Sequence, residues 1–338
     1  MTALMKNGSA HNSESAEAQR VILEIKSLKK YFSTGKKVKG NNQVVKAIND
    51  LSFKLYEGET FAIVGESGCG KSTTGRALLR LIEPTEGQIL YKGVDLCTLK
   101  AKEMKVLRKE MQMIFQDPYS SLNPRKRVGE MIEEPLDIHR IGSKSERTYR
   151  AFELLERVGL HPEQYYRFPH EFSGGQRQRI GIARALAAQP KIIVCDEPVS
   201  ALDVSIQSQI INLLEELQEQ QLLTYVFISH DLGVVRHISD RIAVMYMGRM
   251  VEEAPTEQLY ETPLHPYTRE LLSAIPSLRG EKKEFVRSGE TPSPLDLPKG
   301  CAYQSRCPFV TKRCREEVPH RIQVSDNHFV ECFLYEEA

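Results

Sequence analysis

Apolar runs and alternating apolar and polar positions predict the order of strands along the chain. Residues 20–32 (RVILEIKSLKKYF) alternate as a half-buried strand does. A polar, lysine-containing loop at 33–43 follows, and residues 44–59 supply further strands. Three short, mostly apolar runs predict buried strands, and they read TFAIVG (60–65), KIIVCDEP (191–198) and TYVFISHD (224–231).

Helical segments alternate with these strands. A helix is predicted from about Lys71, and residues 121–188 have a mostly helical pattern. A further helix at 205–221 lies between the last two buried strands, and residues 241–254 resemble a closing hairpin. Because strands that alternate with helices are typical of parallel sheets, we predict an α/β fold with a largely parallel sheet.

The character of the sequence changes near residues 262–264, where prolines become frequent. The length of 338 residues also exceeds what one compact core usually takes. We therefore predict one large domain over residues 21–262 and a smaller C-terminal extension over 263–338. The first 20 residues are polar and rich in small side chains, so we predict that they are disordered.

Composition narrows the class of protein. The formal net charge of +1 gives no global field that would attract nucleic acid or an anionic membrane, so we expect no nucleic-acid partner. No apolar run approaches the roughly 18 residues of a membrane helix, and the N-terminus has no apolar signal segment. We therefore expect a cytoplasmic chain, in which cysteines are normally reduced.

Residues 65–72 (GESGCGKS) match the phosphate-loop pattern G-x-x-x-x-G-K-[ST] at every fixed position, between an apolar strand and a helix. The glycines let successive backbone N–H groups turn around phosphate, and the helix adds its N-terminal dipole. Lys71 would reach the β- and γ-phosphates, and the Ser72 hydroxyl would bind Mg²⁺. The loop predicts a nucleoside triphosphate site, and a chance glycine-rich turn is the weaker alternative.

Two adjacent acids follow another predicted strand. Asp196 ends the apolar run at 191–195 and Glu197 comes directly after it. Asp196 would bind Mg²⁺, and Glu197 would orient or deprotonate an attacking water molecule. Acids are common at strand ends, but an adjacent pair downstream of a phosphate loop is a specific combination.

Four further motifs resemble those of ATP-binding cassette (ABC) ATPases, in family order, over roughly residues 21–260. The signature motif is resembled by EFSGGQRQRIGIARAL, and the Q-loop by IFQDP, which contains Gln116. The D-loop is resembled by VSALD (199–203), and the switch histidine by His230 in ISHD. The resemblance implies a P-loop nucleotide-binding domain with a RecA-like core, an antiparallel β subdomain and a helical subdomain. A small cysteine-rich C-terminal domain would follow it.

The resemblance also implies roles for individual residues. Glu197, His230 and Lys71 would be catalytic, and Ser72, Gln116 and Asp196 would bind Mg²⁺. Two such domains pack head to tail in the family, so the signature of one chain contacts the ATP of its partner. Phe32 would stack on adenine, with Tyr31 as its substitute. The other implied ATP-binding residues are Gly65, Glu66, Ser67, Gly68, Cys69, Gly70, Lys71, Ser72, Thr73 and Gln116. The implied signature residues are Ser173, Gly174, Gly175 and Gln176, and the D-loop residue is Asp203.

Longer stretches, including FQDPYSSLNPRKRVGEMIEEPL and HPYTRELLSAIP, resemble the ATPases of oligopeptide/dipeptide importers, most closely the F-type subunit. The resemblance implies ATP hydrolysis coupled to peptide import, on the cytoplasmic face of the cell membrane. Expected partners are a second ATPase subunit in a heterodimer, two transmembrane permease subunits and an extracytoplasmic substrate-binding protein. Pro118, Tyr119 and Leu122 are candidates for receiving a coupling helix of a permease subunit. Import of nickel or glutathione is an alternative, and a soluble ABC ATPase without a transport role is a weaker one.

Four of the seven cysteines lie near the C-terminus, at Cys301, Cys307, Cys314 and Cys332. Zinc sites usually contain close C-x2–4-C pairs, which are absent here, whereas a [4Fe–4S] cluster takes four thiolates at wider spacing. Some peptide-importer ATPases that this chain resembles carry such a cluster in this extension. We therefore predict a [4Fe–4S] cluster, with Zn²⁺ as the alternative, and favour a structural role over redox sensing.

Overall fold

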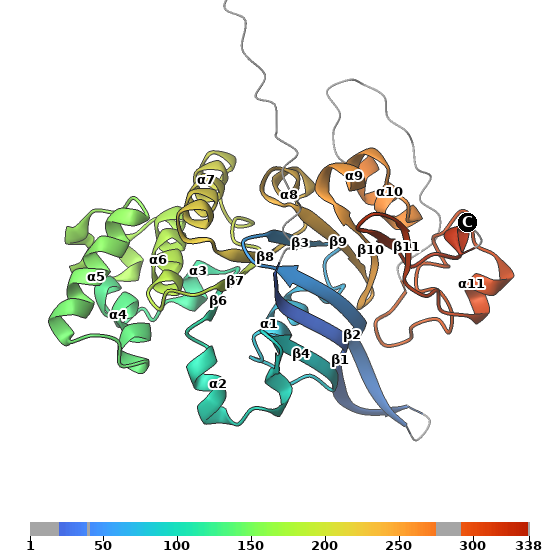
Figure 1. Ribbon diagram of the computed structural model, residues 1–338, viewed down its shortest axis with the longest axis horizontal. Helices are drawn as coiled ribbons and strands as arrows, with labels where there is room; N and C mark the ends of the chain where they lie inside the picture. Colours follow the sequence, from blue (N-terminus) through green and yellow to red (C-terminus); the bar gives the residue numbers. More distant parts are fainter. Residues whose placement is uncertain (1–19, 39–40, 275–291, 337–338) are drawn as a thin grey trace, which may run out of the picture.

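The computed structural model describes residues 20–38, 41–274 and 292–336. Two sheets meet at the centre, a group of helices lies on one side, and the C-terminal segment lies on the other (Figure 1). The N-terminal residues 1–19, which we predicted to be disordered, lie outside the described part of the chain. Among the described residues, none of the helices has the length and apolar character needed to span a bilayer.

The larger sheet has eight strands in the order β11-β12-β10-β9-β3-β8-β7-β6. Its five consecutive strands from β9 to β6 pair in parallel, which confirms the largely parallel sheet. β9 and β10 form the predicted closing hairpin. The strands are β3 Thr60–Val64, β6 Met111–Ile114, β7 Ile192–Asp196, β8 Thr224–Ser229, β9 Arg241–Tyr246, β10 Arg249–Pro255, β11 Ile322–Ser325 and β12 His328–Val330.

The smaller sheet is antiparallel, in the order β2-β1-β4-β5. Its strands are β1 Val21–Val38, β2 Asn41–Tyr56, β4 Glu86–Tyr91 and β5 Val94–Asp95. The loop predicted at 33–43 is too long, because the β1–β2 ladder extends into this stretch as far as the pair of Val38 with Asn41. The polar composition suggested a loop, but ladder hydrogen bonds join main-chain groups and do not require apolar side chains.

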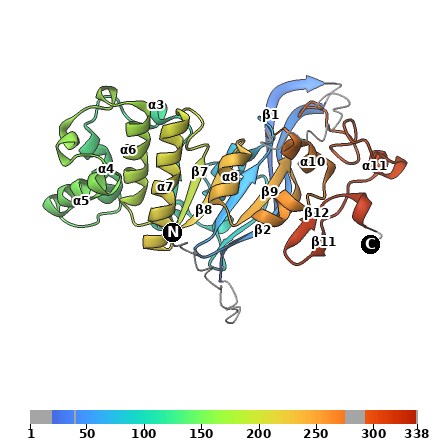
Figure 2. The ribbon, with the colours of Figure 1, turned by 90° about the horizontal axis from the view of Figure 1, so that it is seen from above.

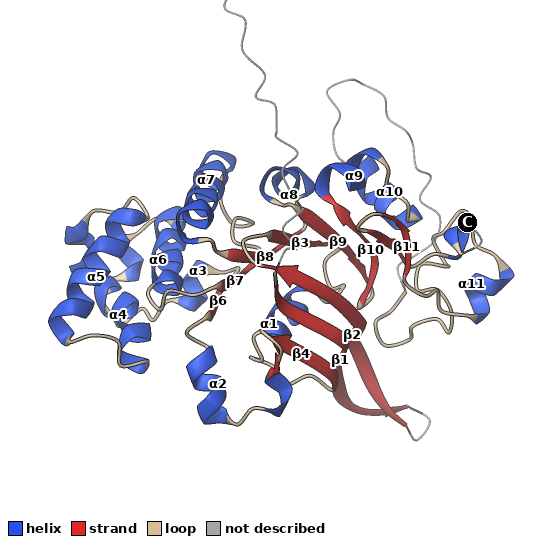
Figure 3. Ribbon diagram, in the orientation of Figure 1, coloured by secondary structure: helices blue, strands red, loops and turns tan. Residues whose placement is uncertain are grey.

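The predicted helical region forms a group on one side of the larger sheet (Figure 3). It contains α3 Pro118–Ser121, α4 Val128–Ile138, α5 Lys144–Arg157 and α6 Gly174–Leu186. α5 begins where the Ser143 hydroxyl and the Glu146 side chain form a reciprocal capping box, and its buried residues Ala151, Leu154 and Leu155 lie on one face. The other helices are α1 Lys71–Leu78, α2 Ala101–Leu107, α7 Val204–Gln221, α8 Leu232–Ile238, α9 Thr256–Glu261, α10 Pro266–Ser273 and α11 Lys312–Glu316.

The C-terminal segment is joined to the core rather than separate from it. Strands β12 and β11 continue the larger sheet beyond β10 (Figure 2). Three buried tyrosines pack together at this junction, with the ring of Tyr246 centred 4.6 Å from that of Tyr267 and 5.4 Å from that of Tyr303. The segment after residue 262 therefore shares the hydrophobic core of the preceding domain, and a separate cysteine-rich domain is not shown.

Candidate nucleotide-binding and catalytic site

The phosphate loop connects β3 to α1, and close contacts with β2 and within the loop fix its conformation. Gly70 has a φ of 110°, and a Cβ atom there would lie 2.1 Å from the carbonyl oxygen of Ala47, so only glycine fits. The buried Lys71 ammonium donates to the carbonyl oxygens of Gly65 at 2.8 Å and Glu66 at 3.0 Å. These bonds place a positive charge inside a loop of main-chain N–H groups, which is an arrangement suited to phosphate.

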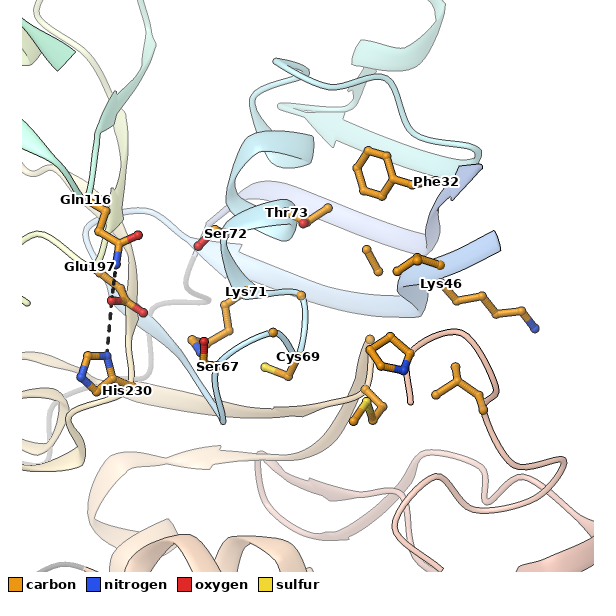
Figure 4. A pocket seen from close by; sticks show the side chains of 18 residues that line it. Phe32, Lys46, Ser67, Cys69, Lys71, Ser72, Thr73, Gln116, Glu197 and His230 are labelled. Atoms are coloured by element: carbon orange, nitrogen blue, oxygen red, sulfur yellow. Dashed lines mark hydrogen bonds and ion pairs between the residues drawn. The ribbon is translucent and has the colours of Figure 1, made fainter. Parts of the chain in front are cut away.

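A cleft of about 590 Å³ opens against this loop. It gathers residues from distant parts of the sequence, and Figure 4 shows Gln116, Glu197 and His230 beside the loop that carries Lys71 and Ser72. The predicted residues that line the cleft are Phe32, Ser67, Gly68, Cys69, Gly70, Lys71, Ser72, Thr73, Gln116, Glu197 and His230. Tyr31, Gly65, Glu66 and Asp196, which we also predicted, are not among its lining residues.

Glu197 is held by side chains from two other segments. The Gln116 amide nitrogen donates to Glu197 Oε2 at 2.7 Å, and His230 Nδ1 lies 3.3 Å from the same oxygen. Glu197 also has a φ of 46°, a conformation that residues other than glycine adopt infrequently. The carboxylate is thereby fixed at the wall of the cleft, where it can accept a proton from water.

Asp196 lies at the end of β7 and is almost completely buried. Neither carboxylate oxygen has a hydrogen-bond partner among the described residues. Burial raises the pKa of Asp196, and the nearby Ser72 hydroxyl and Arg76 guanidinium, the latter at 3.9 Å, oppose the rise. Because a hard cation such as Mg²⁺ prefers oxygen ligands, a buried carboxylate beside a hydroxyl fits the Mg²⁺ that the sequence predicts.

Apolar side chains line the part of the cleft near β1 and β2. Phe32 is 41% exposed there, with Val45 nearby along the same wall. Tyr31 is directed elsewhere, since its hydroxyl donates to Asn49 Oδ1 at 3.0 Å. Pro294 and Leu297 complete the lining from the C-terminal segment. Neither residue was predicted from the sequence, because no local pattern connects a proline-rich stretch with a phosphate loop more than 200 residues earlier.

The signature residues lie outside this cleft. Ser173 caps α6, since its hydroxyl accepts from the Gln176 N–H at 3.4 Å while the Gln176 side chain accepts from the Ser173 N–H at 3.0 Å. The helix therefore begins at Gly174, directly after this cap. Ser173 and the D-loop residue Asp203 are both exposed. Their placement leaves the N-terminus of α6 accessible to another molecule.

A groove of about 620 Å³ lies next to the cleft, and Gln116 lines both. Of the residues predicted to receive a coupling helix, none lines this groove: Leu122 is buried in the core, and the Tyr119 ring packs 3.8 Å from the Arg177 guanidinium carbon. The groove is instead lined by apolar and basic side chains that include Leu79, Leu81, Met111, Phe115, Arg108 and Arg184. The prediction that Pro118, Tyr119 and Leu122 receive a coupling helix stays a prediction.

All four C-terminal cysteines line a second cavity of about 230 Å³. Burial raises the pKa of the Cys301 thiol to about 12 and that of Cys332 to about 11. No disulfide joins them. Within the described ranges, His, Cys, Asp and Glu side chains form no group of three that could hold a metal ion. The structure therefore brings the four thiols to one cavity, but the described residues form no metal-binding group there.

Comparisons with known proteins agree with this geometry. A family model described as ABC transporter matches residues 48–200. A second, described as oligopeptide/dipeptide transporter, C-terminal region, matches residues 251–314. Among solved structures, the dimeric post-hydrolysis state of the ATP-binding cassette MJ0796 bound to ADP and Pi is similar, with 32% identity and a TM-score of 0.63. The similarity covers 69% of this chain and 98% of that one.

Curated relatives match over nearly their whole length. The oligopeptide transport ATP-binding protein AppF of Bacillus subtilis is 53% identical over 326 residues, which are 95% of this chain and 99% of that protein. The dipeptide transport ATP-binding protein DppF of Haemophilus influenzae is 49% identical over 314 residues, 92% of this chain and 96% of that protein. These matches confirm the P-loop ABC fold and the predicted group. The chain belongs to the ABC transporter family, in the group that carries the oligopeptide/dipeptide transporter C-terminal region.

Proposed function

We propose that the chain is the subunit that hydrolyses ATP to ADP and phosphate to drive import of dipeptides and oligopeptides. The observation that carries the enzymatic part is the position of Glu197, which Gln116 and His230 hold at the wall of the phosphate cleft. The substrate class is supported by the match to the C-terminal region and by the names of relatives such as AppF and DppF.

Different residues of the cleft would have different roles in hydrolysis. The loop N–H groups and Lys71 bind the phosphates, and the carboxylate of Glu197 takes a proton from the attacking water. Gln116 and His230 keep that carboxylate in place. Ser72, Asp196 and Gln116 would hold Mg²⁺, which neutralises phosphate charge when it is bound. Since phosphoryl transfer needs mainly positioning and charge neutralisation, these residues would supply this chain's part of the ATP site.

A second ATPase subunit would complete the ATP site. The exposed N-terminus of α6, capped by Ser173, would bind the ATP held by that partner, as two domains of the family pack head to tail. We propose that the partner is a different chain. ATP would then favour the closed pair because it binds that state more tightly than the open one.

Membrane partners would dock beside the Q-loop. The groove that Gln116 shares with the cleft has apolar and basic walls, which suit a short amphipathic helix of a permease subunit. We propose two such subunits and an extracytoplasmic substrate-binding protein, with this chain on the cytoplasmic face of the membrane. Movement in the groove would reach Glu197 through the Gln116 side chain.

We also propose a [4Fe–4S] cluster held by Cys301, Cys307, Cys314 and Cys332. The proposal is supported by the position of the four thiols, which line one cavity of about 230 Å³. When bound, the cluster would cross-link the C-terminal segment at four points, a structural role like that of metals in small domains.

Growth tests the substrate class most simply. Cells that lack the gene, and cells that carry Glu197→Gln in its place, should fail to grow on defined dipeptides or oligopeptides as the sole source of a required amino acid. The wild-type gene should restore growth. If the deletion strain instead grows normally on peptides but loses uptake of nickel or glutathione, the peptide assignment is wrong and the ATPase assignment remains.

A further inference from the structure

A residue of the C-terminal segment contacts the phosphate loop directly. The Arg306 guanidinium donates to both carboxylate oxygens of Glu66, from Nη1 to Oε2 at 3.0 Å and from Nη2 to Oε1 at 2.9 Å. Glu66 is the second residue of the phosphate loop, 240 positions earlier in the sequence. Two parallel charge-assisted bonds fix the orientation of both side chains as well as their separation.

Glu66 is also held through its main chain, and one of these contacts reaches the catalytic lysine. Its N–H donates to the Tyr267 hydroxyl at 2.9 Å. Its carbonyl oxygen accepts from the Lys71 ammonium at 3.0 Å. The position of Glu66 therefore sets one of the two carbonyl groups that orient Lys71. A side chain that moves Glu66 changes the direction in which the ammonium points.

Arg306 is itself fixed by its surroundings. Only 7% of its side chain is exposed, and its guanidinium also pairs with the buried Glu270. The rings of Tyr303 and Tyr246 lie 5.7 and 6.0 Å from the guanidinium carbon. Because a guanidinium held in this way cannot follow a mobile loop, its bond to Glu66 anchors the loop to the core.

We propose that Arg306 is a positioning residue of the ATP site, which acts through Glu66 to hold Lys71 in the orientation that binds phosphate. The C-terminal segment is then part of the nucleotide site as well as an attachment to it. The inference rests on the proposed ATPase function only because ATP is taken as the ligand of the phosphate loop. Neither the phosphate-loop pattern nor the spacing of the cysteines identifies Arg306.

The test is a set of ATP titrations on the purified full chain in the presence of Mg²⁺. Arg306→Gln and Glu66→Gln should each weaken ATP binding by about tenfold, and the double variant should be no weaker than either single variant. Arg306→Lys should restore part of the affinity, because an ammonium can pair with Glu66 but cannot form both bonds. Binding of adenosine, which has no phosphate, should be the same in all variants.

Two variants separate the loss of the Arg306–Glu66 contact from a general loss of folding. Glu66→Gln leaves the Arg306–Glu270 pair intact, so it tests the contact without exposing a buried charge. Arg321→Gln is the matched control from the same segment, since Arg321 pairs with the buried carboxylate of Glu253 at 2.9 Å. It should change thermal stability without changing the Kd for ATP.

Three results would overturn the inference. They are a Kd for ATP within about twofold of wild type in folded Arg306→Gln and Glu66→Gln, equal losses for ATP and adenosine, or additive losses in the double variant. A wild-type chain that does not bind ATP would instead contradict the proposed function, so the two failures are distinguishable.

Discussion

The side-chain amide of Gln116 lies 2.7 Å from the carboxylate of Glu197, although the two residues are 81 positions apart. Gln116 follows β6 and Glu197 follows the adjacent strand β7, so the parallel pairing of these strands brings both to the same edge of the sheet. Gln116 also lines the neighbouring groove. This single contact joins the surface proposed for a membrane partner to the group proposed for catalysis.

The first prediction concerns Glu197. In Glu197→Gln the side chain keeps its size and can still contact Gln116, but it can no longer accept a proton from water. We expect the Kd for ATP to change little and turnover to fall by at least about a hundredfold. Phosphate release measured on the assembled complex checks this, and undiminished turnover would remove Glu197 from its role.

The second prediction uses the cap of α6. Ser173→Asp keeps a side chain that caps a helix but adds negative charge where the phosphates of the partner's ATP would lie. We expect the variant to fold and to bind its own ATP normally, because Ser173 does not line the cleft of its own chain. Turnover of the complex should fall by more than about tenfold.

Ser173→Asn is the matched control for that variant, because asparagine caps helices about as well as aspartate and carries no charge. A complex with Ser173→Asp that hydrolyses ATP as fast as the one with Ser173→Asn would show that the signature does not face phosphate.

The third prediction concerns the apolar wall of the cleft. Phe32→Ala and Leu297→Ala should each weaken ATP binding by about fivefold, since stacking and apolar contact with a base contribute about 1 kcal/mol. Inorganic triphosphate, tested as a competitor, should bind all variants equally. Tyr31→Phe is the control, because the Tyr31 hydroxyl contacts Asn49 and not the cleft. Unchanged ATP affinity in both alanine variants would place the base elsewhere.

The fourth prediction concerns the cysteine cavity. Protein purified without oxygen should be brown and contain about four iron and four sulfide per chain. Cys307→Ser should lose iron and lower the melting temperature, whereas Cys97→Ser should keep the iron, because Cys97 lies outside the cavity. Zinc without sulfide would make the segment a zinc module, and the absence of both metals would contradict the metal assignment.

The sequence predicted those parts of the molecule whose backbone requirements are local. The phosphate loop, the helix that starts at Lys71 and the strand before Asp196 each depend on consecutive residues, and each lies where it was expected. Gln116, Glu197 and His230 meet the phosphate loop in one cleft because parallel strands end at the same edge of the sheet.

The contributions of the C-terminal segment were not predictable in this way. Arg306 packs against the rings of Tyr246 and Tyr303, and Leu297 packs against the larger hydrophobic core. No spacing rule relates these two residues to residues 65–72, although both reach the nucleotide site. The short strands β11 and β12 also carry little apolar pattern, because β11 lies at the edge of the sheet and most of its residues are exposed. β12 joins the larger sheet by pairing with β10, and β11 joins it by pairing with β12.

Peptide uptake driven by ATP tests the central claim most directly. The complete complex, purified through a tag on this chain and reconstituted in vesicles with the ATPase side accessible, would be supplied with a labelled dipeptide and the substrate-binding protein. We predict that the peptide crosses the membrane only with ATP and Mg²⁺ present, and that Glu197→Gln abolishes transport while ATP still binds. Peptide transport that proceeds equally without ATP, or equally with Glu197→Gln, would contradict the account.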